Sequence, residues 1–383
     1  MFFKSREEKK ATPVNLKPAE GLTEAIVLKA LSQVNDPDLN RDIVSLGFIK
    51  NLKISGRNVS FNVELTTPAC PVKDQLKKEC FDRVKELSGV DNVEVTMTAN
   101  VRTSAPKGGG TNRISLPSVK NVIAVASGKG GVGKSTVTIN LAVALSKTGA
   151  KVGLLDADIY GPSVPLMLGV KDRPVTIENR LQPIEKNGIK LMSMGFLVPE
   201  NQPVIWRGPM VHGALTQFLT QVEWGDLDYL LIDMPPGTGD AQLTISQNAP
   251  LSGALIVTTP QDVSLLDARR GLLMFTSVNV PILGVIENMA GFVCSHCNEV
   301  TDIFRKGGGA RIAKEMKVPF LGSIPIDPKV AEGGDSGEPT VAAHPKAEVS
   351  KRFTALAGDV AAQLSILQAQ AAGNFKPVSL DWQ

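Results

Sequence analysis

The sequence predicts a doubly wound α/β domain with a mostly parallel sheet, preceded by a small α+β domain. Near-continuous apolar runs recur through the second part of the chain, and helical patterns separate them. Such runs are typical of parallel strands that are buried on both faces, and their alternation with helices indicates repeated βαβ units. We therefore expect strands at 122–126, 152–155, 229–232, 254–257, 282–286 and 320–324.

Composition excludes few classes of function. The chain has 383 residues, of which 43% are hydrophobic, and 41 basic against 38 acidic residues give a formal net charge of +3. This balance gives no electrostatic reason to expect a nucleic acid or an anionic membrane as a partner, so we expect neither. The first residues lack the apolar stretch of a secretory signal, and four cysteines do not resemble a disulfide framework. We expect a cytoplasmic protein.

Five segments are expected along the chain. We predict a flexible lead-in at 1–21, the small α+β domain at 22–103, and a flexible linker with three consecutive glycines at 104–117. The α/β domain then occupies 118–365, and a C-terminal tail follows at 366–383. The last long helix, around 347–370, has few basic residues, which is unlike a membrane-binding helix.

The small domain shows both helical and strand patterns. Helices are predicted at 22–35 and 72–87, and strands at 59–65 and 91–97. Val59, Phe61, Val63 and Leu65 alternate along the first of these strands and predict one buried face. A unit of about 80 residues is large enough to fold alone.

A glycine-rich loop between a predicted strand and a predicted helix at 134–147 matches the phosphate-loop pattern. Glycines let successive backbone N–H groups point at phosphate oxygens, next to the positive end of the helix. Lys134 is expected to neutralise the β and γ phosphates, and Ser135 to bind Mg²⁺. We assign nucleotide binding to Gly128, Lys129, Gly130, Gly131, Val132, Gly133, Lys134, Ser135 and Thr136.

Acidic residues follow two of the predicted strands. Asp233 ends one strand and is expected to support Mg²⁺, together with Asp156 at the end of another. We expect Asp158 to position the attacking water. Asp156 or Asp158 could instead cap a helix or turn. No acceptor-substrate site is evident, so hydrolysis of ATP is favoured over a kinase reaction.

Lys129 is not required by the general phosphate-loop pattern, and with it the loop resembles that of the deviant Walker A ATPases, which are P-loop NTPases of the SIMIBI type. That group includes MinD, ParA and the nitrogenase iron protein. The resemblance implies an ATP-bound homodimer in which Lys129 acts on the partner's nucleotide, in the way an arginine finger does. Without the resemblance, a solvated loop lysine is an equally good interpretation.

Within this group the chain is most similar to the Mrp/ApbC iron-sulfur cluster carriers. The segments that carry the similarity are Asp156–Ser163, Trp206–Met210, Asp233–Asp240, Glu287–Met289 and Cys294–Cys297. The resemblance implies that Asn288 contacts adenine; the alternative is a polar cap at a strand end. The small domain also resembles cytosolic iron-sulfur assembly domains, through Asn35–Asp38 and Thr66–Pro71.

The pair Cys294 and Cys297 has the spacing of one edge of a metal site. A tetrahedral thiolate site or a cubane cluster needs four ligands, and one chain offers two here. Zinc across a dimer, a redox pair and an inert surface pair are all compatible with the spacing. The family resemblance implies a 4Fe-4S cluster that bridges a homodimer, although Ser295 stands where family members often have proline.

The other two cysteines differ in their surroundings. Cys80 falls on the apolar stripe of the helix predicted at 72–87 and is expected to be an ordinary core residue. Cys70 lies in a loop between Ala69 and Pro71. It could have a buried structural role, or it could contact a cluster or a partner.

The leading functional hypothesis is an ATP-hydrolysing carrier that holds a cluster at its dimer interface. Its partners would be apo iron-sulfur recipient proteins and cluster scaffold proteins. The alternative is a MinD- or ParA-like positioning ATPase without a cluster. A third class, an electron-donating reductase, would require redox turnover of a cluster coupled to ATP.

Overall fold

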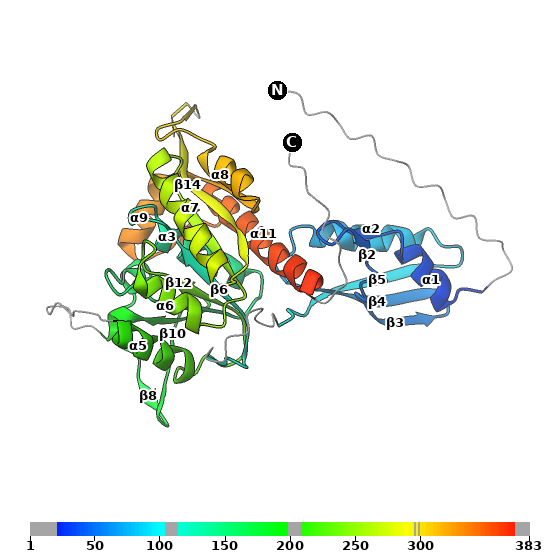
Figure 1. Ribbon diagram of the computed structural model, residues 1–383. Helices are drawn as coiled ribbons and strands as arrows, with labels where there is room; N and C mark the ends of the chain where they lie inside the picture. The colour runs from blue at the N-terminus through cyan, green and yellow to red at the C-terminus, as the bar shows by residue number, and fades with distance from the viewer. Residues whose placement is uncertain (1–20, 104–113, 198–207, 295, 298, 372–383) are drawn as a thin grey trace. The chain divides into compact units, whose positions relative to one another are not determined.

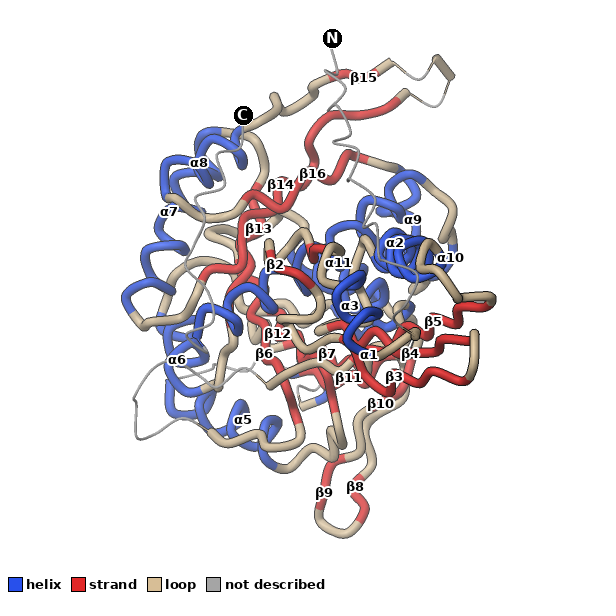
Figure 2. The backbone as a smooth tube through the Cα atoms, turned by 90° about the vertical axis from the view of Figure 1, so that its right-hand side faces the viewer, coloured by secondary structure: helices blue, strands red, loops and turns tan. Residues whose placement is uncertain are grey.

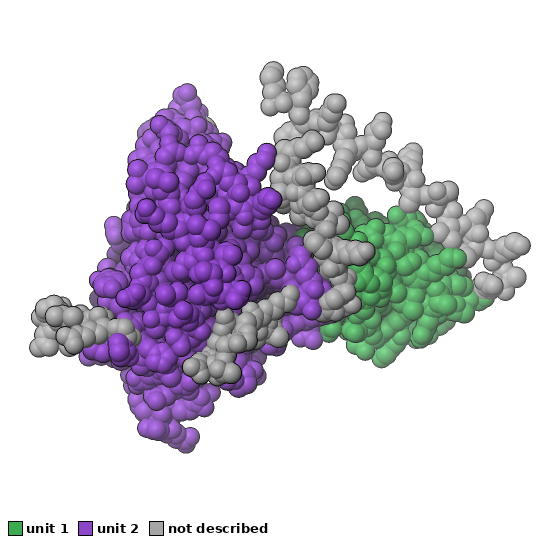
Figure 3. Space-filling view, in the orientation of Figure 1, with its two compact units in different colours: residues 1–64, 72–98 green, residues 65–71, 99–383 purple. Residues whose placement is uncertain are grey.

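The computed structural model describes residues 21–103, 114–197, 208–294, 296, 297 and 299–371. The chain forms two compact units: residues up to Glu64 with Val72–Thr98, and Leu65–Pro71 with the residues from Ala99 onward (Figure 3). Nearly all of the predicted lead-in, residues 104–113 of the predicted linker and the tail from 372 onward lie outside the described residues. No described helix is long and apolar enough to cross a membrane.

Unit 1 has a three-stranded sheet in the order β3-β4-β5 with two main helices (Figure 1). Its elements are α1 (Glu24–Leu31), β1 (Asn35–Asp36), β2 (Arg41–Asp42), β3 (Ile49–Ser55), β4 (Asn58–Leu65), α2 (Lys73–Lys85) and β5 (Asn92–Ala99). The predicted alternation along β4 is confirmed, because Val59, Phe61, Val63 and Leu65 are all buried.

The helix predicted at 22–35 is shorter in the structure. Thr23 caps its start by accepting a hydrogen bond from the N–H of Ile26. The carboxylate of Asp36 accepts hydrogen bonds from the backbone of Asp38 and Leu39 and so folds the next residues into a turn. Asn35 and Asp36 pair with β2 instead of extending α1.

Strand β3 was not predicted, because its outward-facing lysines and asparagine weaken the apolar pattern.

Unit 2 is built on a mostly parallel sheet in the order β10-β11-β7-β12-β6-β13-β14-β15, with β16 also paired to β14. Only β10 and β15 run antiparallel to their neighbours among the described strands of this sheet. Its strands are β6 (Val119–Ala126), β7 (Val152–Asp156), β10 (Ile184–Lys186), β11 (Ile189–Ser193), β12 (Leu227–Asp233), β13 (Gly253–Thr258), β14 (Ile282–Val293), β15 (Val300–Thr301) and β16 (Phe320–Ile326). A separate hairpin consists of β8 (Thr176–Ile177) and β9 (Arg180–Leu181).

Helices cover both faces of this sheet (Figures 1 and 2). They are α3 (Lys134–Lys147), α4 (Val164–Met167), the 3₁₀ helix η1 (Met194–Phe196), α5 (Gly208–Thr220), α6 (Asp240–Asn248), α7 (Asp262–Ser277), α8 (Gly308–Met316), α9 (Pro328–Ser336), α10 (Thr340–Ala343) and α11 (Glu348–Ala371). Successive residues of β6 serve two separate cores. Ile123 and Val125 pack with α3 and α11, whereas Val122 and Ala124 pack with α5, α6 and α7. The predicted doubly wound fold is confirmed.

The segment Leu65–Pro71 belongs to unit 2 although the predicted small domain, 22–103, included it. The hydroxyl of Tyr229 on β12 donates a hydrogen bond of 3.0 Å to Thr67 Oγ1. The Ser365 hydroxyl on α11 donates to Thr66 Oγ1 at 2.9 Å. Gly358 lies so close to Ala69 that an added Cβ would be 3.1 Å from its carbonyl oxygen. These contacts hold Leu65–Pro71 in unit 2. They join residues far apart in the chain, so the local sequence pattern could not predict them.

Candidate nucleotide site and cysteine hairpin

The phosphate loop connects β6 to α3 and has the backbone that a phosphate cradle needs. Gly131 and Gly133 both have φ of +79°, in the left-handed region that favours glycine. Gly128 is required for another reason: an added Cβ would lie 2.1 Å from the backbone of Asp267 on α7. A Cβ on Gly130 or Gly131 would meet no atom within 4 Å, so the loop is open on that side. The loop fits a nucleotide phosphate chain.

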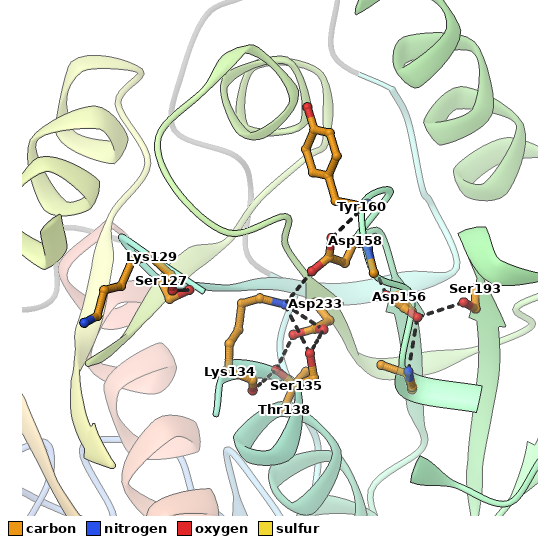
Figure 4. A network of polar contacts seen from close by, with 12 residues as sticks. Ser127, Lys129, Lys134, Ser135, Thr138, Asp156, Asp158, Tyr160, Ser193 and Asp233 are labelled. Atoms are coloured by element: carbon orange, nitrogen blue, oxygen red, sulfur yellow. Dashed lines mark hydrogen bonds and ion pairs between the residues drawn. The ribbon is translucent and has the colours of Figure 1, made fainter. Parts of the chain in front are cut away.

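Lys134 and Asp233 form a buried ion pair at the centre of the site (Figure 4). Lys134 Nζ lies 2.7 Å from Asp233 Oδ2, and their side chains are 6% and 0% exposed. The Ser135 hydroxyl donates to the same carboxylate oxygen at 2.6 Å. A hydroxyl and a carboxylate side by side next to the phosphate loop are the oxygen ligands that Mg²⁺ takes in P-loop enzymes, so the residues fit this metal.

Thr138 is a site residue that the sequence reasoning missed. Its hydroxyl lies 2.8 Å from Asp233 Oδ1 and 2.9 Å from the carbonyl oxygen of Lys134. Asp233 therefore has hydroxyls or an ammonium on both of its oxygens. The spacing could have indicated this residue, because Thr138 follows Lys134 by four positions and so lies on the same face of α3.

Asp156 ends β7 and is fully buried. Its Oδ1 accepts the N–H of Asp158 at 3.2 Å, and its Oδ2 accepts the Ser193 hydroxyl at 2.8 Å. Oδ2 also accepts the N–H of Val164 at 3.3 Å. Burial raises the pKa of Asp156 to about 7, and the nearby charge of Asp233 acts in the same direction. The sequence analysis did not identify Ser193, because Lys190 interrupts the apolar residues of its strand, β11.

Asp158 presents one carboxylate oxygen to the loop and the other to the centre of the site. Oδ1 accepts the N–H groups of Tyr160 at 3.1 Å and Gly161 at 3.3 Å. Oδ2 lies 3.8 Å from Lys134 Nζ. The Asp158 carboxylate thus reaches the ammonium of the lysine that is predicted to bind the β and γ phosphates (Figure 4).

Lys129 belongs to the phosphate loop, and Asn288 on β14 contacts that loop. The side chain of Lys129 is half-buried and points away from Lys134 and Asp233 (Figure 4). The Asn288 amide on β14 donates a hydrogen bond of 2.9 Å to the carbonyl oxygen of Val132. The structure therefore brings Asn288 to the phosphate loop. Its contact with adenine and the action of Lys129 on a partner's nucleotide stay predictions.

Glu287, the neighbour of Asn288, anchors another element. Its buried carboxylate accepts the N–H of Gly309 at 2.6 Å and the N–H of Gly307 at 3.1 Å. These donors belong to the start of α8, where helix N–H groups have no partner within the helix. The two residues Glu287 and Asn288 thus fix β14 to α8 and to the phosphate loop.

Cys294 and Cys297 lie in the turn of an antiparallel hairpin. We call residues 293–301 the cysteine hairpin. Val293 pairs with Val300, and the N–H of Cys294 donates to the carbonyl oxygen of Glu299 at 3.0 Å. Cys294 is half-buried and Cys297 is exposed. Ser295 lies outside the described residues.

The turn of this hairpin favours a thiolate. Backbone N–H groups of Cys297 and His296 that hydrogen-bond to the Cys294 sulfur hold the pKa of that thiol below its usual value. The donor chemistry therefore fits a thiolate-bound metal. Within the described part of the chain, no group of three or more His, Cys, Asp or Glu could hold a metal ion. Two thiolates from one chain supply two of the four ligands that a tetrahedral thiolate site or a cubane cluster needs.

The remaining cysteines lie elsewhere. Cys80 is buried on α2, as the stripe of that helix predicted, and burial raises its pKa to about 12. Cys70 is half-buried in the segment that packs into unit 2. A role for Cys70 in contact with a cluster or partner stays a prediction.

Residues 206 and 207 of the predicted motif at 206–210 lie outside the described residues.

Comparison with known proteins identifies the family. A model described as NUBPL iron-transfer P-loop NTPase matches residues 118–361, and one described as iron-sulfur cluster assembly protein matches residues 24–97. An iron-sulfur cluster carrier protein of Synechocystis sp. is 50% identical over 353 residues, which cover 90% of this chain and 99% of that protein. An iron-sulfur protein of Arabidopsis thaliana that is required for NADH dehydrogenase is 53% identical over 268 residues, covering 70% and 86%.

Among solved structures, the nucleotide-binding protein of Archaeoglobus fulgidus in complex with ADP is similar to this chain. It is 43% identical, with a TM-score of 0.53, and the match covers 58% of this chain and 88% of that one. The comparisons confirm both the resemblance and the P-loop fold that the sequence predicted. This chain belongs to the family of NUBPL iron-transfer P-loop NTPases.

Proposed function

We propose that the protein binds and hydrolyses ATP and carries a 4Fe-4S cluster, as cargo, between two copies of itself. The observation that supports this most is the course of β14. Asn288, within this strand, contacts the phosphate loop, and Cys294 follows its last residue directly. A single strand thus connects the nucleotide loop to the thiolates that would hold the cargo.

Each part of the nucleotide site has a proposed role. The N–H groups of Gly128–Thr136 and the Lys134 ammonium bind the phosphates. Ser135 and Asp233 hold Mg²⁺, with Asp156 supporting the site; the metal neutralises charge on the phosphate oxygens. Asp158 orients a water molecule for attack on the γ-phosphate, because its Oδ2 lies on the same side as Lys134 Nζ.

The partner copy completes both sites in this proposal. Lys129, which points away from its own Lys134, reaches the nucleotide of the partner, and Asn288 recognises adenine. Cys294 and Cys297 of each copy supply the four thiolates that a cubane cluster requires. Cluster scaffold proteins would load this site, and apo iron-sulfur proteins would receive the cargo.

Anaerobic reconstitution with iron and sulfide tests the proposal. The wild-type protein should acquire a visible chromophore and about four iron ions per two chains. Cys294→Ala should abolish the chromophore, while its ATP affinity stays within about twofold of that of the cluster-free wild-type protein, since the phosphate loop is untouched. Cys80→Ala, which removes a thiol from the core of α2, serves as the control and should load fully.

Three results would overturn parts of the proposal. A chromophore that survives Cys294→Ala would remove the cluster from this hairpin. Zinc without sulfide in protein purified in the absence of air would indicate a structural site instead. Iron loading of a species that stays monomeric in gel filtration would contradict a bridging cluster.

A further inference from the structure

The buried carboxylate of Asp156 holds both ends of the loop that carries Asp158. This loop, residues 157–163, follows β7 and leads into α4. At its start, the N–H of Asp158 donates to Asp156 Oδ1 at 3.2 Å. At its end, the N–H of Val164 donates to Asp156 Oδ2 at 3.3 Å. One side chain therefore closes a loop of seven residues into a ring.

Ser193 supplies the third hydrogen bond to this carboxylate from a neighbouring strand. Ser193 pairs with Asp156 in the parallel register of β11 and β7, and both residues are fully buried. Its hydroxyl donates to Asp156 Oδ2 at 2.8 Å and accepts the N–H of Gly195 at 2.9 Å. The hydroxyl proton thus has one available direction, toward Asp156, because the other side of the oxygen is occupied by a donor.

The order of these contacts leads from the sheet to the site. Strand β11 fixes Ser193, Ser193 orients the Asp156 carboxylate, and that carboxylate fixes the backbone of Asp158. The Asp158 side chain then folds over its own loop, with Oδ1 on the N–H groups of Tyr160 and Gly161. Its Oδ2 is left facing Lys134. Figure 4 shows this line of contacts from Ser193 to the phosphate loop.

We propose that Ser193 and Asp156 are positioning residues for ATP hydrolysis, which act by holding Asp158 in line with the γ-phosphate. The inference rests on the proposed role of Asp158 in orienting water. A carboxylate that is buried and accepts three hydrogen bonds from three parts of the fold is a rigid support. Rates of bond-making steps depend steeply on such positioning: a displacement of about 1 Å can cost about 100-fold.

The test separates turnover from nucleotide binding. Ser193→Ala removes the hydroxyl, and we expect kcat for ATP hydrolysis to fall at least about tenfold. The Kd for ATP should stay within about twofold, because Lys134, Ser135 and the glycines are not contacted by Ser193. Ser193→Thr keeps the hydroxyl and should restore most of the rate.

Ser252→Ala is the matched control. Ser252, directly before β13, is also buried, and its hydroxyl oxygen accepts the N–H of Val122 on β6 at 3.1 Å; it contacts neither Asp156 nor the loop of Asp158 in any hydrogen bond of the described residues. This variant should keep the wild-type kcat. If Ser193→Ala retains kcat, or if its Kd weakens as much as its kcat falls, the inference is wrong.

Two further variants keep the test decisive. Asp156→Asn has nearly the same volume but replaces one acceptor oxygen by a donor, so it should lower kcat at saturating Mg²⁺ even if Ser193→Ala fails to fold. Asp158→Asn should lose hydrolysis by itself. If Asp158→Asn hydrolyses ATP at the wild-type rate, the proposed role of Asp158 fails. If it is inactive while Ser193→Ala and Asp156→Asn are fully active, only the positioning role fails.

Discussion

The nucleotide site and the cysteine hairpin are built in opposite ways. Around Lys134 and Asp233, side chains of α3 and β12 already satisfy one another through contacts of 2.6–2.8 Å. In the cysteine hairpin, Cys297 is exposed and Val293 and Val300 expose 44% and 57% of their surface. The first region is held together within one chain, whereas the second presents one half-buried and one exposed thiol.

This difference follows from what each region is proposed to hold. A phosphate chain needs rigid dipoles and charges in fixed places, which a packed sheet edge provides. A cargo that must be handed to another protein needs ligands at the surface. A half-buried and an exposed thiol beside the ends of a short hairpin are accessible to a second copy or to a recipient, and a buried site would not be.

Thiol reactivity gives the largest expected contrast. Cys80 has its pKa raised to about 12 by burial, whereas backbone N–H groups lower that of Cys294. Since the thiolate is the reacting species, the native protein at neutral pH should alkylate at Cys294 about 1,000-fold faster than at Cys80. Peptide mass spectrometry measures both rates. Comparable labelling of the two residues would contradict the described surroundings of one of them.

Lys134→Ala should have the largest effect on stability. The change leaves the buried carboxylate of Asp233 without its ammonium partner, so we expect the unfolding free energy to fall by about 3 kcal/mol. Lys120→Ala is the control, because its ion pair with Asp228 is of similar length but partly exposed, and it should cost less than about 1 kcal/mol. Equal losses in denaturant titrations would show that the buried pair contributes nothing beyond a surface pair.

A smaller effect is expected from Thr138→Val, which keeps the shape of the side chain and removes the hydroxyl next to Asp233. Because this hydroxyl bonds to a charged group, we expect its removal to lower the unfolding free energy by about 1.5 kcal/mol. Thr354→Val, whose hydroxyl bonds to a backbone carbonyl on α11, should cost less. If both variants unfold at the same denaturant concentration, Thr138 does not support the buried carboxylate.

The smallest effect on stability should come from the cysteine hairpin. Cys297→Ala in the cluster-free protein should change the unfolding free energy by less than about 0.5 kcal/mol, because the side chain is exposed. The same denaturant titration measures it. A loss of more than about 2 kcal/mol would mean that the hairpin has a structural role in the single chain.

The sequence predicted the parts of the molecule that rest on local patterns. The apolar runs that became β6, β7, β12, β13, β14 and β16 are recognisable because parallel strands are buried on both faces. The residues of the phosphate loop were recognisable because their spacing is imposed by the ligand. In contrast, β3 and β11 have polar residues that hide the pattern.

Contacts between distant segments could not be predicted from local patterns. Ser193 reaches Asp156 only because two strands lie side by side in parallel register, and nothing near Ser193 in the sequence indicates a site. In the same way, Thr67 meets Tyr229 through a hydrogen bond between residues that are 162 positions apart. Such pairs depend on the whole fold.

In the proposed function, the phosphate loop and the cysteine hairpin act together through β14. The most direct measurement is the Kd for ATP of the cluster-free and cluster-loaded protein, determined anaerobically at the same protein concentration. Coupling predicts that loading changes this Kd by at least about fivefold, since linked sites must affect each other reciprocally. The same Kd in both forms, with the cluster intact throughout, would contradict the claim.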